Sequence, residues 1–114
     1  MTQGRRRLGI AGEDRAARWY AEAGYQVLAR NWRGEGGEID LVATGHGAIV
    51  FAEVKTRSST RYGVPAEAVG PVKQRRLRGL AAQFLRAHPG VGGRIRFDVV
   101  AILGSRLQVI EAAF

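Results

Sequence analysis

GEIDLVATGHGAIVFAEVKTR, which spans residues 37–57, predicts two β-strands joined by a turn. Residues 38–43 and 48–56 are the expected strands, because Val, Ile, Leu and Phe dominate both segments. The glycines at positions 45 and 47 mark a short loop over residues 44–47, which is typical of a hairpin. The second strand is apolar on both of its faces, which favours a central strand that is covered from two sides.

The hairpin brings charged side chains together. Closing it across the four-residue loop places Asp40 opposite Glu53 and Glu38 opposite Lys55, all on one face. Opposed Cβ atoms lie about 4.5–5.5 Å apart, so the two carboxylates repel one another unless a cation lies between them. Mg²⁺, which is held by one or two carboxylates plus water and phosphate, fits this arrangement. The alternative is a Glu38–Lys55 ion pair with Asp40 and Glu53 on a solvated face, and the pattern alone leaves both open.

A wider set of motifs carries a family resemblance. Asp40, followed by Glu53-Val54-Lys55 on the next strand, resembles the D…(D/E)xK signature of the restriction-endonuclease-like, or PD-(D/E)xK, nucleases. The further blocks are Gly12-Glu13, Gly24-Tyr25, Arg30-Asn31, residues 37–41, residues 51–57, Lys73 and residues 96–100. In this order, from Leu8 onward, they resemble the YraN-like group of small bacterial proteins, which is similar in turn to archaeal Holliday-junction resolvases. Ile39 stands where the signature has Pro, a position that varies in the superfamily.

The resemblance implies a fold and an activity. The fold is α/β of restriction-endonuclease-like type, a mixed five-stranded sheet flanked by helices. The activity is Mg²⁺- or Mn²⁺-dependent endonuclease hydrolysis of DNA phosphodiesters, branched or structured DNA included, and a homodimer is expected by analogy with resolvases. Asp40, Glu53 and Glu13 would hold the metal, and Lys55 would position the attacking water or stabilise charge. The alternative is a non-catalytic nucleic-acid-binding or complex-assembly protein on a nuclease fold.

Composition is consistent with a nucleic-acid partner. The chain has 114 residues, enough for one domain, and a net charge of +8. A basic protein of this kind favours a polyanionic partner, although an arginine-rich proteome would also produce the excess. There are no cysteines, which excludes disulfides and thiolate metal sites. No signal peptide or membrane-spanning run is evident, so a cytoplasmic protein is expected.

The remaining elements follow from periodicity and turn residues. Residues 1–9 are expected to be a flexible basic tail, and residues 10–114 a single domain. A helix is predicted over 10–23, where Gly24 ends it, and a strand over 25–32. Residues 65–88 are mostly helical, with Pro71 at the first position of the main segment. Residues 94–103 and 106–112 form the last hairpin.

Several further side chains are candidates for the site. Glu13 lies on the inner stripe of the first helix, either to favour the helix dipole or, as the resemblance implies, to reach the metal. Asp98 interrupts an apolar strand and is expected to pair with a buried arginine. Trp32 is expected to pack at a core edge. The candidate nucleic-acid contacts, with DNA favoured over RNA, are Arg57, Arg61, Tyr62, Lys73, Gln74, Arg75 and Arg76.

Overall fold

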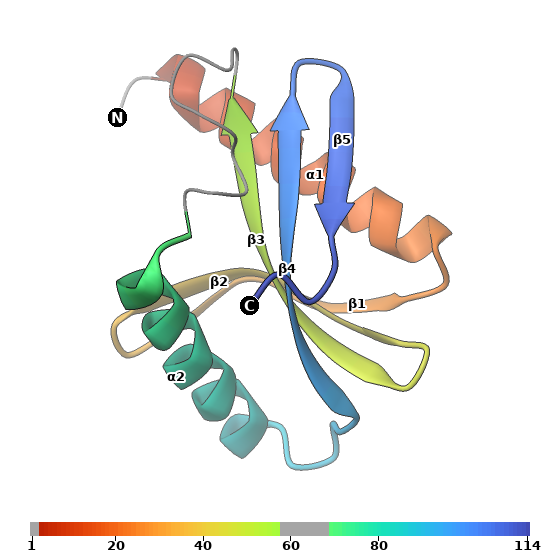
Figure 1. Ribbon diagram of the computed structural model, residues 1–114, viewed down its shortest axis with the longest axis vertical. Coiled ribbons are helices and arrows are strands. Elements are labelled where there is room, and N and C mark those ends of the chain that lie inside the picture. The colour runs from red at the N-terminus through yellow and green to blue at the C-terminus, as the bar shows by residue number, and fades with distance from the viewer. Residues whose placement is uncertain (1–2, 58–68) are drawn as a thin grey trace.

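The computed structural model describes residues 3–57 and 69–114, with side chains from residue 9 onward. The elements are α1 (Gln3–Glu22), β1 (Gln26–Gly34), β2 (Gly37–Gly45), β3 (Ala48–Arg57), α2 (Pro71–Ala87), β4 (Arg94–Leu103) and β5 (Arg106–Ile110). The five strands form one sheet in the order β1-β2-β3-β4-β5 (Figure 1). The predicted α/β fold with a mixed five-stranded sheet is confirmed.

The sheet is mixed because of one connection. Strands β3 and β4 are parallel, whereas every other neighbouring pair is antiparallel. Parallel neighbours need a crossover, and α2 lies on the connection between β3 and β4. The central strand β3 therefore pairs with a hairpin partner on one side and with a strand from much later in the chain on the other.

The hairpin of β2 and β3 has the predicted register over its paired residues. Pairs run from Gly45↔Ala48 to Leu41↔Ala52. The turn is shorter than expected, because His46 and Gly47 alone connect the strands, with φ values of 52° and 77°. Positive φ at both central residues matches the right-handed twist of the flanking strands, as in a type I′ turn.

Two apolar cores lie on opposite faces of the sheet. Helix α2 covers one face and α1 the other (Figure 1). The α2 core contains Ile39, Val42, Ile49, Phe51, Val69, Leu77, Leu80, Ala81, Phe84, Phe97 and Val99. The α1 core contains Ala16, Tyr20, Tyr25, Leu41, Ala43, Ala48, Val50, Ala52, Val100 and Ile102. Trp32 packs edge-on against Phe84, with ring centroids 5.3 Å apart, which confirms its expected place at a core edge.

Helix α1 begins at Gln3, well before the expected start at Ile10. The prediction placed residues 3–9 outside the helix because three consecutive arginines and two glycines hide any apolar period there. The end of the helix is as expected. Gly24 has φ 94°, and Tyr25 N–H donates to Tyr20 O at 2.9 Å, a closing bond that the left-handed residue makes possible. In the part of the chain that the structure describes, neither helix is long and apolar enough to cross a membrane.

Candidate metal and nucleic-acid site

The sheet opens where β2 leaves β3. Their pairing ends at Leu41↔Ala52, although β2 itself continues back to Gly37 against β1. Side-chain alternation also breaks here, since Ile39 belongs to the α2 core and Leu41 to the α1 core. Asp40 lies between them, and its Oδ2 accepts a hydrogen bond of 2.8 Å from Val54 N–H. The Asp40 carboxylate thus accepts the backbone hydrogen bond of Val54 at a point where β2 no longer pairs with β3.

Two lysines contact Glu53 beside this opening. Lys73 Nζ, from the first turn of α2, lies 2.6 Å from Glu53 Oε1, and Lys55 Nζ lies 3.4 Å from the same oxygen. The Glu53 side chain is 7% exposed, that of Lys55 13% and that of Lys73 35%. The site therefore holds a nearly buried acid with two ammonium groups on one oxygen.

The electrostatics of the cluster favour a cation. Burial and the adjacent charge of Glu53 raise the pKa of Asp40 to about 7, partly offset by the Val54 hydrogen bond. Burial, together with the neighbouring Lys73, lowers the pKa of Lys55. Burial acts to lower the pKa of Lys73, but the contacts with Glu53 and Lys55 and the charges of Glu53 and Asp40 together outweigh burial and raise that pKa. A carboxyl group of raised pKa next to a lysine of lowered pKa is typical of functional sites.

Glu13 reaches this neighbourhood from α1. It is near enough for its charge to raise the pKa of Asp40, and its Oε1 accepts a hydrogen bond of 3.1 Å from Asn31 Nδ2. Asn31 has a left-handed φ of 51°, which Asn tolerates better than most residues. Sequence reasoning assigned no role to Asn31. Its signal in the sequence was its membership of the Arg30-Asn31 block of the family resemblance. Arg30 pairs with Asp14 at 2.7 Å, one residue along α1 from Glu13.

A close approach between α1 and β3 sets the height of Glu13 above the sheet. A Cβ added at Gly12 would lie 2.2 Å from Thr56 Oγ1 and 3.3 Å from Thr56 Cβ. A larger residue at this position would force the Thr56 side chain, or one of the two elements, to shift. Gly12 thus lets the helix pass over the end of β3, next to the acids.

Gly12→Ala is expected to destabilise the protein by about 1–3 kcal/mol, because the new methyl group overpacks the contact with Thr56. Urea unfolding monitored by circular dichroism measures the change. Gly9→Ala is the matched control, since a Cβ there meets nothing within 4 Å and should gain about 0.5–1 kcal/mol of helix propensity. Thr56→Ala should recover part of the Gly12→Ala loss, and equal losses in both backgrounds would contradict the contact.

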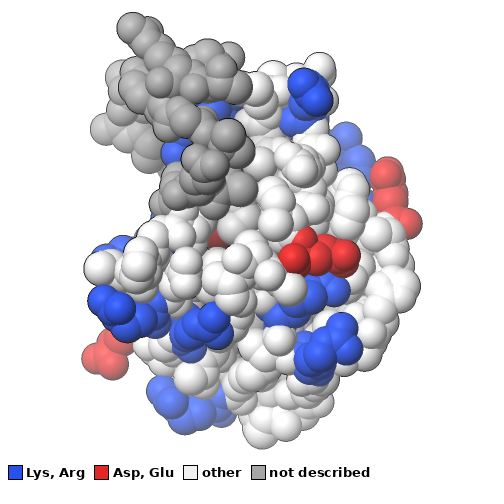
Figure 2. Space-filling model, viewed as in Figure 1, with Lys and Arg blue, Asp and Glu red and all other residues white. Residues whose placement is uncertain are grey.

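The other predicted nucleic-acid residues are distributed differently. Arg75 and Arg76 are exposed near the start of α2, and Figure 2 shows basic side chains gathered on the side of the molecule that carries this helix. Gln74 is engaged elsewhere, because its Nε2 donates to Val69 O at 3.0 Å ahead of the helix. Arg57 donates to Thr56 O at 2.9 Å. Arg61 and Tyr62 lie outside the described residues.

Glu38 does not face Lys55 as predicted. Its carboxylate lies 3.5 Å from Arg33 NH2 across the β1–β2 hairpin, and its side chain is 41% exposed. The prediction was wrong because it extended the β2–β3 ladder past the point at which the strands separate. For the same reason the predicted pairing of Asp40 with Glu53 is not part of the ladder. Separation of the strands is a tertiary feature that alternation within one strand does not encode.

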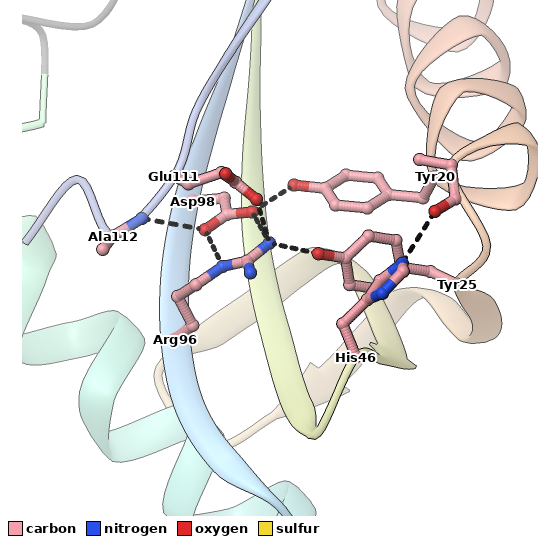
Figure 3. Close-up of polar contacts among 8 residues, drawn as sticks. Tyr20, Tyr25, His46, Arg96, Asp98, Glu111 and Ala112 are labelled. Carbon is pink, nitrogen blue, oxygen red and sulfur yellow. Dashed lines mark hydrogen bonds and ion pairs between the residues drawn. The ribbon is translucent and has the colours of Figure 1, made fainter.

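Asp98 belongs to a different cluster, on the α1 face of the sheet (Figure 3). Arg96 donates to both of its oxygens, from Nε at 2.9 Å and from NH2 at 2.8 Å. Tyr20 OH donates to Oδ2 at 2.7 Å, and Ala112 N–H donates to Oδ1 at 3.1 Å. The expected pair of Asp98 with a buried arginine is confirmed. With its oxygens occupied in this way, Asp98 is a structural acid.

The donor set suits a hard divalent ion. Within residues 3–57 and 69–114, no three His, Cys, Asp or Glu side chains are grouped so as to hold a metal. Asp40 and Glu53 supply two carboxylates, and Mg²⁺ is commonly held by one or two, with water and phosphate completing its shell. Burial, and then the charge of Glu53, raise the pKa of Asp40, and a divalent ion would relieve the repulsion between the two carboxylates. Ligation by Glu13 stays a prediction.

The fold and the motif of two acids and a lysine together indicate the structural class of the protein. An α/β chain with a mixed five-stranded sheet, two flanking helices and Asp40, Glu53 and Lys55 at its opening is compatible with the restriction-endonuclease-like fold. The chain belongs to the uncharacterised protein family UPF0102, whose family model matches residues 12–102. This agrees with the resemblance to the YraN-like group.

Relatives cover most of the chain. A UPF0102 protein of Rhodococcus opacus (strain B4) is 53% identical over 96 residues, which are 84% of this chain and 81% of the relative. A UPF0102 protein of Moorella thermoacetica is 47% identical over the whole of both chains. A third, from Symbiobacterium thermophilum, is 50% identical over 96% of this chain and 97% of its own length. Similarity thus extends through the site and both cores.

Proposed function

We propose that this protein is a Mg²⁺- or Mn²⁺-dependent endonuclease that hydrolyses DNA phosphodiester bonds. The observation that carries the proposal is the pair of acids Asp40 and Glu53 at the point where two central strands separate, with Lys55 beside them. A half-buried carboxylate whose pKa is raised to about 7 beside a second acid is a feature that clusters at functional sites. The arrangement is better suited to holding a divalent ion against a phosphate.

Each residue of the site would have a separate role in phosphodiester hydrolysis. Asp40 and Glu53 would hold the ion, and Glu13 would orient groups around it from α1. A bound divalent ion supplies Lewis-acid polarisation of the phosphate and lowers the pKa of an attacking water. Lys55 is fixed on β3 two residues from Glu53, where its ammonium would donate to the phosphate oxygen on which negative charge develops. Burial of Lys55 strengthens that interaction, since water screens it less.

Substrate binding would use the basic side of α2. Arg75 and Arg76 are exposed next to Lys73, and such side chains neutralise phosphates without reading sequence. Binding is therefore expected to weaken steeply with salt. A DNA substrate is favoured over RNA by the motif resemblance. Cleavage of a matched RNA is the relevant comparison, because the 2′-OH is what distinguishes the two at a given site.

The second candidate is a nucleic-acid-binding module that does no hydrolysis. The observation that favours it is the contact of Lys73 with Glu53 at 2.6 Å, which makes the acid part of an internal ion pair. Such a protein would keep the exposed arginines of α2 and would bind DNA with no requirement for a metal ion.

One assay separates the two candidates. End-labelled linear, flapped, single-stranded and four-way-junction DNA are incubated with the full chain and Mg²⁺ or Mn²⁺, with EDTA and Lys55→Ala as controls. We expect cleavage products that require the metal and are lost in Lys55→Ala, and the preferred substrate would indicate the biological role. DNA binding that survives EDTA, with no cleavage of any substrate, would reject the nuclease and support the binding module.

A further inference from the structure

Lys73 differs from Lys55 although both contact the same oxygen of Glu53. Lys55 lies on the same strand as Glu53, two residues away, and its side chain is 13% exposed. Lys73 comes from the first turn of another element, α2, and its side chain is 35% exposed while its Nζ makes the shorter contact, 2.6 Å. Lys55 is thus held in the cluster by its strand, whereas the ammonium of Lys73 can turn toward solvent on a flexible stem.

Lys73 occupies the position beside the two acids that a divalent ion at this site would need. Its ammonium lies on Glu53 Oε1, and its charge also acts on Asp40, where it lowers the pKa. The Lys73 ammonium therefore interacts electrostatically with both Asp40 and Glu53. A divalent ion held by Asp40 and Glu53 would compete with Lys73 for Glu53, because two ammonium groups already lie on Oε1 and a third, doubly charged cation beside them would be strongly repelled in a partly buried site.

We propose that Lys73 is an exchangeable internal counter-cation that neutralises the Asp40–Glu53 pair in the free protein, gives up Glu53 to the divalent ion, and transfers its ammonium to a phosphate oxygen of the incoming nucleic acid. This inference rests on the proposed function and adds a form of regulation to it. When the metal ion binds alone, displacement of Lys73 from Glu53 weakens metal binding. When nucleic acid is also present, Lys73 gains a phosphate as a new anionic partner. Metal and nucleic acid therefore promote one another's binding, by the same factor in each direction.

Metal affinity in the absence of nucleic acid tests the exchange. Mn²⁺ is titrated calorimetrically into the full chain, with wild type and variants at the same pH and salt concentration. Lys73→Met, which keeps the length of the stem and removes the charge, should bind Mn²⁺ about tenfold more tightly than wild type because the competing cation is gone. Arg86→Met is the matched control, since it removes the same charge from an exposed position at the other end of α2 and should leave the affinity unchanged.

Thermal unfolding distinguishes exchange from a merely structural ion pair. Without metal, Lys73→Met should have a lower Tm than wild type, since the acids lose a counter-charge. Saturating Mn²⁺ should raise the Tm of Lys73→Met by more than it raises that of wild type, as tighter binding to the folded state requires. A lower Tm with unchanged or weaker Mn²⁺ affinity would overturn the exchange, and so would Mn²⁺ binding to neither protein.

Cleavage assays keep this inference separate from the nuclease itself. Metal-dependent cleavage by wild type, with equal Mn²⁺ affinity in Lys73→Met, would reject the exchange and leave the nuclease intact. Tighter Mn²⁺ binding by Lys73→Met, with no cleavage by wild type on any DNA, would support the exchange and reject the nuclease.

Discussion

Asp40→Asn is expected to abolish metal-dependent cleavage and, at the same time, to stabilise the fold. Activity should fall by about a thousandfold or more, because a neutral amide is a poor ligand and several kcal/mol of charge stabilisation depend on the bound ion. The fold should survive, since the Asn carbonyl can still accept the Val54 N–H that Asp40 accepts at 2.8 Å. Cleavage of the best substrate, followed in Mg²⁺ and Mn²⁺, measures the first effect.

The gain in stability follows from the sign of the pKa shift. The pKa of Asp40 is raised from 3.8 to about 7 in the folded protein, so between these values the folded state binds more protons than the unfolded state. Stability from this group therefore falls as pH rises through that window and stays low above it. Asn has no such titration, so Asp40→Asn should gain roughly 1–3 kcal/mol near pH 8 and little near pH 4.

Asp14→Asn is the matched control for both effects. Asp14 lies on α1 with 49% of its side chain exposed, and it pairs at the surface with Arg30. It should change stability by less than about 1 kcal/mol and leave cleavage intact. Cleavage by Asp40→Asn at the wild-type rate would rule out metal binding by Asp40, and a loss of stability at pH 8 would contradict its raised pKa.

Asp98→Ala is expected to destabilise the protein by about 3–5 kcal/mol, a large part of the total for a domain of this size. The Asp98 side chain is fully buried, and it receives the Arg96 guanidinium, the Tyr20 hydroxyl and the Ala112 N–H. Truncation leaves a guanidinium that is 11% exposed without its principal partner and the hydroxyl without an acceptor. Urea unfolding near neutral pH measures the loss.

Glu111→Ala is the comparison that distinguishes the buried Arg96–Asp98 pair from the exposed Arg96–Glu111 pair. Glu111 contacts the same guanidinium at 3.1 Å, but its side chain is 56% exposed. Its removal should cost less than about 1 kcal/mol, and that cost should vanish at high salt, whereas the Asp98→Ala loss should persist. Tyr20→Phe should cost about 1.5–3 kcal/mol, for one buried hydrogen bond to a charged acceptor. Similar losses for Asp98→Ala and Glu111→Ala would show that Asp98 is not the centre of the network.

The elements of the fold were largely predictable from sequence because local signals agree. Alternation, the His46-Gly47 turn, Gly24 and Pro71 each mark a boundary that the structure has within a few residues. The start of α1 was not predictable. Apolar periodicity is a signal of burial, and residues 3–9 carry arginines and glycines instead.

The candidate site was predictable where strand register decides it and not where tertiary packing does. The hairpin register correctly brings Asp40 near Glu53, since the β2–β3 pairing ends one residue before them, but the predicted direct pairing of these two residues is not made. The contact of Lys73 with Glu53 depends on where α2 returns to the sheet after the crossover, which no local pattern encodes. Glu38 was misplaced because the two strands separate before reaching it.

The hydrogen bond between Tyr20 and Asp98 has a consequence for synthesis on the ribosome. Its two residues are 78 positions apart, so when α1 first emerges the acceptor for its buried hydroxyl has not yet been made. The packing of α1 against the sheet is completed by this hydrogen bond only after β4 has been translated and has paired with β3. Closure of such distant contacts is slow, so the protein completes its folding late, after most of its chain has left the ribosome.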